Sequence, residues 1–257
     1  MKLLELQKVT KRFGGLTAVG DLSFSIEKDT IYGLIGPNGA GKTTVFNLIT
    51  GIYQLSEGKI LFDGKNIENL KPYQVANVGI TRTFQNIRLF KNLSTYDNIL
   101  TACHFHADYN LLGAILRSKS FKKGEKELEK QAKELMDILE LSDRKDVIAK
   151  NLPYGLQRRL EIARALALKP KLLLLDEPAA GMNPDETIRL MELIKEIRDR
   201  FKLTILVIEH HMDLIMGICD RISVINFGRK LAEGTAGEIQ ENAKVKEAYL
   251  GEEEVIC

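Results

Sequence analysis

The segment Gly36-Pro-Asn-Gly-Ala-Gly-Lys42-Thr43 is the strongest single indication of the fold expected for this chain. It fits the pattern of a phosphate-binding loop, in which a glycine-rich turn ends in Lys followed by Ser or Thr. Glycines let the backbone curl so that successive N–H groups face one anion. An apolar run at residues 30–35 precedes the loop, and a helix is predicted to start near Lys42 and to stop near Gly51. The N-terminus of that helix would add its dipole and its free N–H groups to a phosphate site.

The residues of this loop have separate expected roles. Lys42 can reach the β and γ phosphates of a nucleoside triphosphate, and the hydroxyl of Thr43 can ligate Mg²⁺. The residues expected to hold the phosphates are Gly36, Pro37, Asn38, Gly39, Ala40, Gly41, Lys42, Thr43 and Thr44. The loop therefore predicts a nucleoside triphosphate with Mg²⁺ as the bound group.

A leucine run that ends in two acids supplies the second half of the predicted site. Residues 172–175 are all Leu, which predicts a strand buried on both faces. Asp176 would then lie at the carboxyl edge of a parallel sheet, where ligands bind in open α/β folds. Asp176 can hold Mg²⁺ through water, and Glu177 is positioned to polarise the attacking water as a general base.

These two motifs leave a small-molecule kinase and a GTPase open as alternatives. A GTPase would need a guanine-reading segment such as Asn-Lys-x-Asp, and the sequence contains none. The deciding segment is Leu152-Pro-Tyr-Gly-Leu-Gln-Arg-Arg-Leu-Glu-Ile-Ala-Arg-Ala-Leu166, which resembles the signature segment of ABC ATPases and the helix that follows it.

Three shorter segments carry the same resemblance. Phe84-Gln85 resembles the glutamine loop of ABC ATPases, Gly181-Met-Asn183 resembles the D-loop, and Ile208-Glu-His210 resembles the switch-histidine strand. The order and spacing of these segments match an ABC ATPase across the whole chain.

The resemblance implies an α/β fold of one ABC ATPase domain. Its P-loop NTPase (RecA-like) core is expected at about residues 1–87 and 161–257, with an antiparallel β part at the N-terminus. A helical subdomain that carries the signature is expected at about residues 88–160. Two such chains would hold two ATP molecules head to tail between them.

The same resemblance implies roles for three further side chains. Phe13 stands where the family has an aromatic ring under adenine, and stacking of a base on a ring is worth ~1–3 kcal/mol in nucleic-acid sites. Gln85 would contact Mg²⁺ or the attacking water. His210 would contact the γ-phosphate and stabilise the transition state, as donors aimed at developing charge do. The expected catalytic residues are thus Lys42, Gln85, Glu177 and His210, and the expected metal ligands are Thr43, Gln85 and Asp176.

The signature segment departs from its usual form, Leu-Ser-Gly-Gly-Gln. In that form, the serine hydroxyl and glycine N–H groups clasp the γ-phosphate of the ATP on the partner chain. Here Pro153 replaces the serine and Tyr154 replaces the first glycine, whereas Gly155 remains as an expected nucleotide contact. Pro153 has neither a hydroxyl nor an N–H to donate, so this chain is expected to clasp its partner's nucleotide weakly.

The altered signature is itself similar to one ATPase subunit of branched-chain amino-acid importers. Asp176-Glu-Pro-Ala-Ala-Gly-Met-Asn-Pro184 and the closing Glu247-Ala-Tyr-Leu-Gly251 share this similarity. In that subfamily, two different ATPase chains pair beneath two transmembrane permease subunits, and a substrate-binding protein lies outside. The resemblance therefore implies an ATP-driven importer motor with a second, different ATPase chain and permease subunits as partners. Residues 86–93 are expected to contact the permease.

The composition of the chain restricts where it is expected in the cell and which other functions are possible. The chain is 44% hydrophobic and 28% charged, like an ordinary soluble globular protein. Its net charge of +2 is too small to favour nucleic acid on electrostatics alone. No apolar run approaches the ~18–20 residues that a membrane span needs. The chain is therefore expected in the cytoplasm, held peripherally at the inner face of the cell membrane. The alternative is a soluble ABC ATPase that acts on nucleic acid or ribosomes.

Overall fold

The computed structural model describes residues 1–107 and 114–253 of the 257-residue chain. Contacts divide the chain into two compact units: a core unit of Met1–Gln85 with Lys171–Cys257, and a helical unit of Asn86–Pro170. The sequence led us to expect the helical part to end near residue 160. Its boundary in the structure lies at Pro170, because α6 (Tyr154–Ala167) packs against other helices of the helical unit.

A six-stranded sheet forms the centre of the core unit. Its strands are β3 (Ile31–Ile35), β6 (Ile80–Arg82), β7 (Leu172–Asp176), β8 (Thr204–Ile208), β9 (Arg221–Asn226) and β10 (Arg229–Gly234). Their order is β10-β9-β3-β8-β7-β6, and every neighbouring pair is parallel except β10 with β9. β3, β7 and β8 are buried along their whole length, which explains why their sequences are almost entirely apolar.

The parallel strands bring the ends of distant segments to one edge of the sheet. β3 runs directly into the phosphate-binding loop, whereas β7 ends at Asp176 and β8 ends at Ile208. The carboxyl edge of such a sheet is where open α/β folds bind their ligands. The topology therefore places the loop, Asp176 and the residues after Ile208 on the same side of the core.

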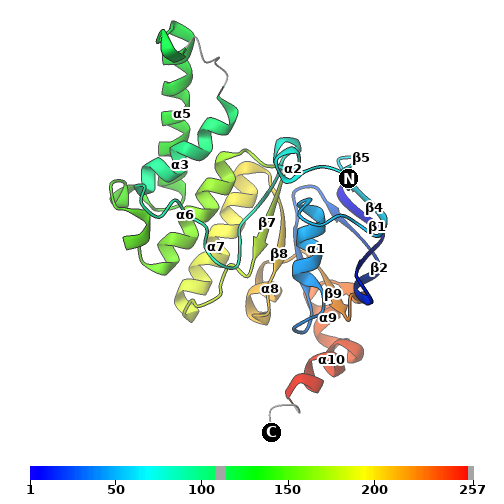
Figure 1. Cartoon of the computed structure of the whole chain (residues 1–257). Helices are drawn as coiled ribbons and strands as arrows, with labels where there is room; N and C mark the ends of the chain where they lie inside the picture. The colour runs from blue at the N-terminus through cyan, green and yellow to red at the C-terminus, as the bar shows by residue number, and fades with distance from the viewer. Residues whose placement is uncertain (108–113, 254–257) are drawn as a thin grey trace. The chain divides into compact units, whose positions relative to one another are not determined.

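Helices flank this sheet, and Figure 1 shows α1 and α7 on either side of β7 and β8 in that view. The helices of the core unit are α1 (Lys42–Ile49), α2 (Pro72–Val78), α7 (Pro184–Phe201), α8 (Met212–Ile218), α9 (Ala236–Glu241) and α10 (Ala243–Glu253). The start of α7 is well specified, because Asn183 and Glu186 form a capping box and Pro184 occupies the first turn. It then buries Leu190, Leu193, Ile194 and Ile197, the spacing of one apolar helix face.

A second, four-stranded sheet is antiparallel, as the resemblance implied. It consists of β1 (Lys2–Phe13), β2 (Leu16–Glu27), β4 (Glu57–Phe62) and β5 (Lys65–Asn66), in the order β2-β1-β4-β5. Ile60 and Phe62 of β4 belong to the same buried cluster as Phe46 and Ile49 of α1. This sheet therefore shares its apolar core with the helix that follows the phosphate-binding loop.

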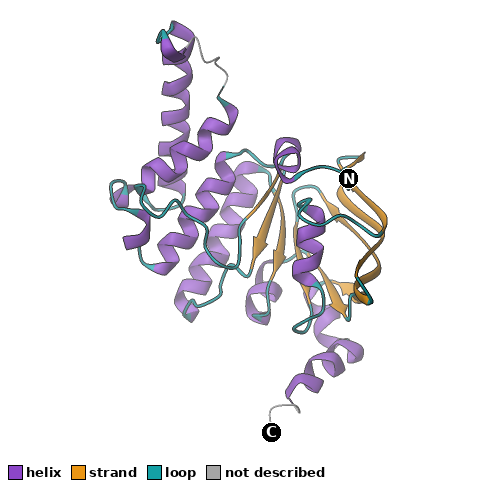
Figure 2. Cartoon of the chain, viewed as in Figure 1, coloured by secondary structure: helices purple, strands orange, loops and turns teal. Residues whose placement is uncertain are grey.

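The helical unit consists of helices and loops, and its described residues contain no β-strand (Figure 2). Besides α6, its helices are α3 (Thr95–Cys103), η1 (His104–His106), α5 (Lys119–Ile138), η2 (Ser142–Arg144) and η3 (Ala149–Asn151). Arg158 of α6 is fully buried, and its Nη1 lies 2.7 Å from Oε2 of Glu161. The other oxygen of Glu161 accepts the N–H of Arg88 at 3.1 Å. This buried ion pair ties the signature helix to the segment that follows Gln85.

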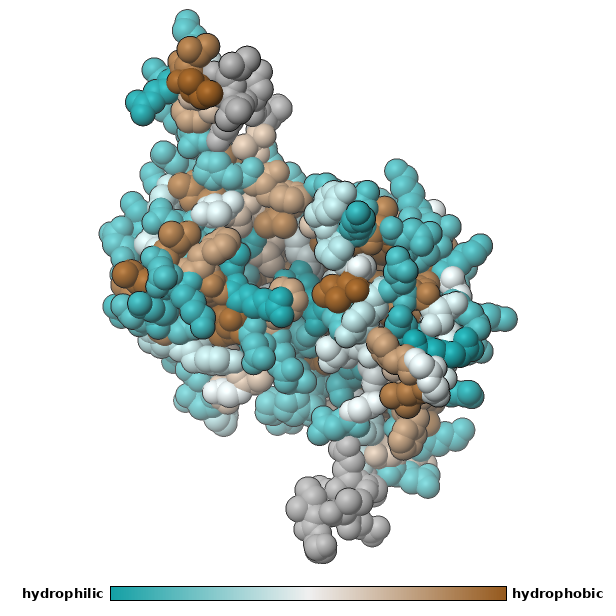
Figure 3. Space-filling model, viewed as in Figure 1, coloured by the Kyte–Doolittle hydropathy of each residue, from teal (hydrophilic) through white to brown (hydrophobic). Residues whose placement is uncertain are grey.

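One face of the surface can be followed in Figure 3. The face in Figure 3 is largely hydrophilic, with hydrophobic residues in separate groups, as on most globular proteins. Among residues 1–107 and 114–253, no helix has both the length and the hydropathy that a bilayer crossing requires.

Candidate nucleotide-binding site

The phosphate-binding loop takes its shape from its glycines. Gly39 and Gly41 have φ angles of 76° and 100°, in the left-handed region that side chains disfavour. At Gly41, an added Cβ would also lie 2.6 Å from the carbonyl oxygen of Ala18, whereas the space at Gly39 is open. The main chain of β2 thus comes so close to the loop that only glycine fits at position 41.

Lys42 is folded back over this loop. Its Nζ donates to the carbonyl oxygens of Gly36 at 2.6 Å and Pro37 at 3.0 Å. Only 7% of the residue is exposed, although its charge would normally favour the surface. The ammonium group is therefore already held in the concave side of the loop, where a bound phosphate would be.

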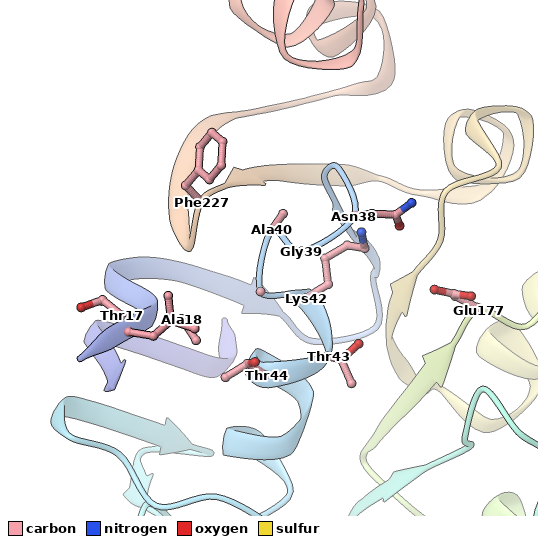
Figure 4. Close-up of a pocket in the computed structure, with 12 residues that line it drawn as sticks. Thr17, Ala18, Asn38, Gly39, Ala40, Lys42, Thr43, Thr44, Glu177 and Phe227 are labelled. Carbon is pink, nitrogen blue, oxygen red and sulfur yellow. The ribbon is translucent and has the colours of Figure 1, made fainter. Parts of the chain in front are cut away.

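A cavity of about 330 Å³ opens beside the loop (Figure 4). Its lining consists of Leu16, Thr17, Ala18, Asn38, Gly39, Ala40, Gly41, Lys42, Thr43, Thr44, Glu177 and Phe227. The structure thus brings the predicted loop residues 38–44 together with Glu177. It adds Phe227 and the start of β2, which no motif in the sequence had indicated.

Phe13 is not among the residues that line this cavity. Its ring is 42% exposed and packs edge-on against Tyr53, with 5.2 Å between the ring centroids. The ammonium group of Lys11 lies 4.8 Å from the Phe13 ring centroid. The ring therefore presents an open surface near the end of β1, and its contact with adenine stays a prediction.

Asp176 is buried and paired with an arginine that the sequence reasoning missed. Nη2 of Arg82 lies 2.5 Å from Oδ2 of Asp176, and Nη1 donates to Oδ1 of Asn47 at 2.6 Å. The guanidinium also lies over the rings of Phe46 and Phe84, 5.3 Å and 5.1 Å from their centroids. Two strands that pair in parallel, β6 and β7, bring this arginine and this carboxylate together. Arg82 therefore fixes where the Asp176 carboxylate points.

The chemistry of the predicted metal ligands suits Mg²⁺. Thr43, Gln85 and Asp176 offer hydroxyl, amide and carboxylate oxygens, which are the ligands this hard cation prefers. Thr43 opens α1 directly after the glycine-rich loop, and Asp176 lies at the end of β7 in the same unit. These residues therefore fit the ion that the resemblance implied, and their assignment as ligands remains a prediction.

Glu177 meets two of the other predicted catalytic side chains. Nε2 of Gln85 donates to Oε2 of Glu177 at 2.8 Å, and Nδ1 of His210 lies 3.9 Å from the same oxygen. The backbone of Glu177 has φ 46°, a conformation that costs about 1–3 kcal/mol in a non-glycine residue and is concentrated at functional sites. Its N–H donates to the carbonyl of Ile208 at 2.9 Å, so β8 helps to hold this strained turn.

Glu209 is a second residue that the sequence reasoning missed. It is fully buried, and its Oε1 accepts the N–H of Ala179 at 2.8 Å. Its Oε2 accepts the N–H groups of His210 at 3.0 Å and His211 at 3.3 Å. One carboxylate therefore joins the segment after β7 to the switch histidine after β8. The available signal was an acid placed directly after a buried, almost entirely apolar strand.

Gly155 lies in the first turn of α6 and belongs to the helical unit. The residue before this helix, Pro153, makes no side-chain capping hydrogen bond. Tyr154 is 43% exposed, and its hydroxyl accepts from Nη2 of Arg158 at 3.2 Å. The departures from the usual signature therefore lie at the start of α6, where Tyr154 is exposed and the buried Arg158 bonds to its hydroxyl.

In this structure a glycine-rich loop leads from a buried strand into a helix, and carboxylates lie at the end of another strand of the same sheet. This arrangement defines a P-loop nucleoside triphosphatase. Residues 19–180 match the family described as ABC transporter, and residues 229–255 match a family described as branched-chain amino acid ATP-binding cassette transporter. The chain belongs to the ABC transporter family, within which it is an ATP-binding and ATP-hydrolysing subunit.

Relatives resemble the chain over almost its whole length. It is 45% identical to the high-affinity branched-chain amino acid transport ATP-binding protein BraF of Pseudomonas aeruginosa, over 97% of this chain and 98% of that protein. It is 46% identical to the corresponding protein LivG of Escherichia coli, with the same coverage. Identity to the lipopolysaccharide export system ATP-binding protein LptB of Escherichia coli is 34%, over 98% of this chain and 99% of that protein.

Solved structures agree with the fold. The ADP conformation of MJ1267, an ATP-binding cassette of an ABC transporter, superposes with a TM-score of 0.84 at 32% identity, over 98% of this chain and 99% of that one. A nucleotide-free ATP-binding cassette from an ABC transporter gives the same TM-score at 31% identity, over 97% of this chain and 99% of that one. The resemblance and the α/β fold expected from the sequence are therefore confirmed.

Proposed function

We propose that this chain is the ATP-driven motor of an importer for branched-chain, hydrophobic amino acids. The observation that carries the proposal is the 45% identity to BraF across 97% of the chain. Residues 229–255, which match the branched-chain amino acid transporter family, support it from a separate segment. The same likeness favours the importer over a soluble ATPase that acts on nucleic acid or ribosomes.

The contacts of the core unit support a division of roles in hydrolysis. Lys42 can exchange the carbonyl oxygens of Gly36 and Pro37 for phosphate oxygens with little movement of its chain. Glu177 orients and deprotonates the attacking water, and Gln85 holds the Glu177 carboxylate until ligand arrives. His210 donates to the γ-phosphate as charge develops there. Mg²⁺, held through Thr43, Gln85 and Asp176, would neutralise charge on the phosphates.

An exposed apolar group in the helical unit supports contact with a permease subunit. Phe90 and Leu93 are 45% and 37% exposed, and Ile148 is 39% exposed. Their main chains lie next to one another, because the N–H of Leu93 donates to the carbonyl of Phe90 at 3.0 Å and the N–H of Ala149 donates to the carbonyl of Leu93 at 2.9 Å. Apolar side chains gathered at one place on a surface mark sites of protein interaction. Such a contact would hold the chain peripherally at the inner face of the cell membrane and link it indirectly to a substrate-binding protein.

The altered signature supports a second, different ATPase chain as a further partner. Pro153 lacks both donors of the usual serine, so two copies of this chain would clasp nucleotide weakly. Light scattering on a Glu177→Gln variant with ATP tests this, since the variant binds but does not hydrolyse. We expect the variant to stay monomeric when it is the only protein present, and to form a dimer when the second ATPase chain is added. An ATP-dependent homodimer would contradict the requirement for a different partner.

Transport itself tests the importer. The chain, its permeases and the second ATPase chain would be reconstituted in liposomes with ATP inside and the substrate-binding protein with labelled leucine outside. We expect ATP-dependent leucine uptake that Glu177→Gln in this chain reduces strongly, because a general base contributes about 10²–10⁴ in rate. A Glu186→Gln variant, changed at a helix cap, serves as the matched control. ATP-dependent uptake of another solute, with no uptake of leucine, would contradict the proposed substrate. It would not contradict the proposed role of the chain as an ATP-driven motor.

A further inference from the structure

The turn between β9 and β10 has an unusual residue at its centre. Asn226 and Arg229 pair across this hairpin, and Phe227 and Gly228 connect them. Their φ angles are 45° and 75°, so both central residues are left-handed. Two-residue hairpin turns of this kind favour Asn, Asp or Gly at both positions. A bulky aromatic residue in a left-handed conformation is an outlier that needs an explanation.

Packing within the chain does not supply that explanation. Phe227 is 86% exposed, more than any other large hydrophobic residue among those that the structure describes. A buried ring could offset its backbone strain with apolar contacts, but this ring gains almost none. Both the turn and the exposure therefore favour a small polar residue at this position.

The turn that carries the ring has a fixed place beside the nucleotide cavity. The N–H of Gly228 donates to the carbonyl of Ala40 in the phosphate-binding loop at 3.0 Å, and the N–H of Gly20 donates to the carbonyl of Gly228 at 2.9 Å. A Cβ at Gly228 would lie 2.5 Å from the carbonyl oxygen of Ala18, so the turn is pressed against β2. Figure 4 shows the Phe227 ring on this turn, with Ala40 next to it.

The two ends of the cavity differ in chemistry. Residues 38–44 provide the backbone N–H groups and the ammonium group that suit phosphates. Glu177 adds a carboxylate to the lining. The other four lining residues, Leu16 to Ala18 and Phe227, offer apolar surface and one hydroxyl, which suit a sugar and a base. An aromatic ring at that end can stack on a base or cover the apolar face of a ribose.

We propose that Phe227 is a nucleotide-contacting residue whose ring covers the nucleoside part of ATP bound to the phosphate-binding loop. This inference rests on ATP binding by the chain. The strained turn holds the ring at the mouth of the cavity before the ligand arrives, so that binding buries an apolar surface that is otherwise in water. Phe227 thereby contributes to affinity for nucleosides and not to affinity for phosphates.

Replacing Phe227 by Asn separates this role from a structural one. Asn suits the left-handed turn, so Phe227→Asn should raise the melting temperature of the ligand-free chain. The same variant should bind ATP about tenfold more weakly by titration calorimetry, near the lower end of what one stacked ring contributes. Binding of inorganic tripolyphosphate should be unchanged, because it has no nucleoside. Phe227→Tyr, which keeps the ring, should bind ATP like the unsubstituted chain.

Three results would overturn the inference. Equal ATP affinity of the unsubstituted chain and Phe227→Asn would show that the ring does not touch the nucleotide. An equal loss for ATP and tripolyphosphate would show that the turn acts only by shaping the phosphate-binding loop. Failure of the unsubstituted chain to bind ATP at all would contradict the ATPase assignment itself, so that failure is distinguishable from the other two.

Discussion

The two sides of the nucleotide site are built differently. On the phosphate side, left-handed glycines shape most of the loop, β2 comes close to it at Gly41, and Lys42 bonds to carbonyls only a few residues away. On the acidic side, the predicted carboxylates Asp176 and Glu177 lie at the end of β7, and side chains from distant parts of the chain hold this region in place. Arg82 of β6 fixes Asp176, and Glu209 after β8 fixes the segment beyond Glu177.

This difference decides what a sequence motif can reveal. The phosphate side is local, so its residues are consecutive and form a recognisable pattern. The acidic side depends on pairs that are far apart along the chain, and its supporting residues come from β6 and from the segment after β8. We therefore expect substitutions on the acidic side to damage the fold as well as activity, and substitutions in the loop to damage binding first.

The largest effect on stability is expected at Arg82. Arg82→Met would leave the buried Asp176 carboxylate without its counter-ion, and removal of one partner from a buried ion pair costs about 3–5 kcal/mol. Urea denaturation of the ligand-free chain measures this loss. The double variant Arg82→Met/Asp176→Asn has no unpaired charge and should recover much of the stability. Equal stability of the two variants would show that the ion pair does not hold the acidic side.

A somewhat smaller loss is expected at Glu209. Glu209→Ala removes the acceptor of three backbone N–H groups, and each unsatisfied buried group costs about 1–3 kcal/mol, part of which water can relieve. We expect a drop of about 3 kcal/mol in the free energy of unfolding and faster amide exchange at Ala179 and His210. Glu209→Gln, which keeps one carbonyl acceptor, should lose less. Unchanged exchange at Ala179 in the Ala variant would contradict the bridge.

The phosphate side is tested by two glycines that differ in one respect. Gly41→Ala combines a left-handed backbone with a Cβ only 2.6 Å from the carbonyl oxygen of Ala18, whereas Gly39→Ala has a left-handed backbone and open space. Strain of about 2–3 kcal/mol at Gly41 should weaken ATP binding about 30- to 150-fold. The effect at Gly39 should be several times smaller. Equal losses in calorimetric titrations would show that strain alone, and not the approach of β2, shapes the loop.

The smallest effect concerns a carboxylate that is held at the surface instead of in the core. Hydrogen bonds from Lys171 and Lys28 lower the pKa of Asp63 from 3.8 to about 2. A lowered folded-state pKa contributes stability above pH 3.8, and this contribution is lost as the pH falls towards 2. Asp63→Asn should therefore be slightly less stable near neutral pH, and the difference should shrink towards zero as the pH falls through 2. A difference that stays constant over this range would contradict the pairing.

Much of the fold and half of the site could be predicted from the sequence. The phosphate-binding loop, the buried strand before Asp176 and the order of the later motifs are consecutive patterns, and together they indicated the fold. The roles of Arg82 and Glu209 could not be predicted, because their partners are separated from them by 94 and 30 residues. Phe227 stood in no motif, and only the φ angle and the exposure of its side chain distinguish it.

The C-terminal boundary of the helical unit could not be predicted from the sequence either. A boundary near residue 160 would cut through α6, which is continuous from Tyr154 to Ala167. Periodicity predicts that this helix exists, but not the unit to which it belongs. Its contacts with α3 and α5 decide that question, and such contacts join residues far apart in the chain.

The position of Lys42 has a consequence for how quickly the site fills. Because its ammonium group is bonded to the carbonyls of Gly36 and Pro37, contacts within the chain itself support the curled form of the loop. An arriving nucleotide exchanges partners with a side chain that has already lost most of its rotamer freedom, and preorganisation of this kind lowers the entropy lost on binding. Association should then be limited by diffusion and by release of water, not by a search among loop conformations.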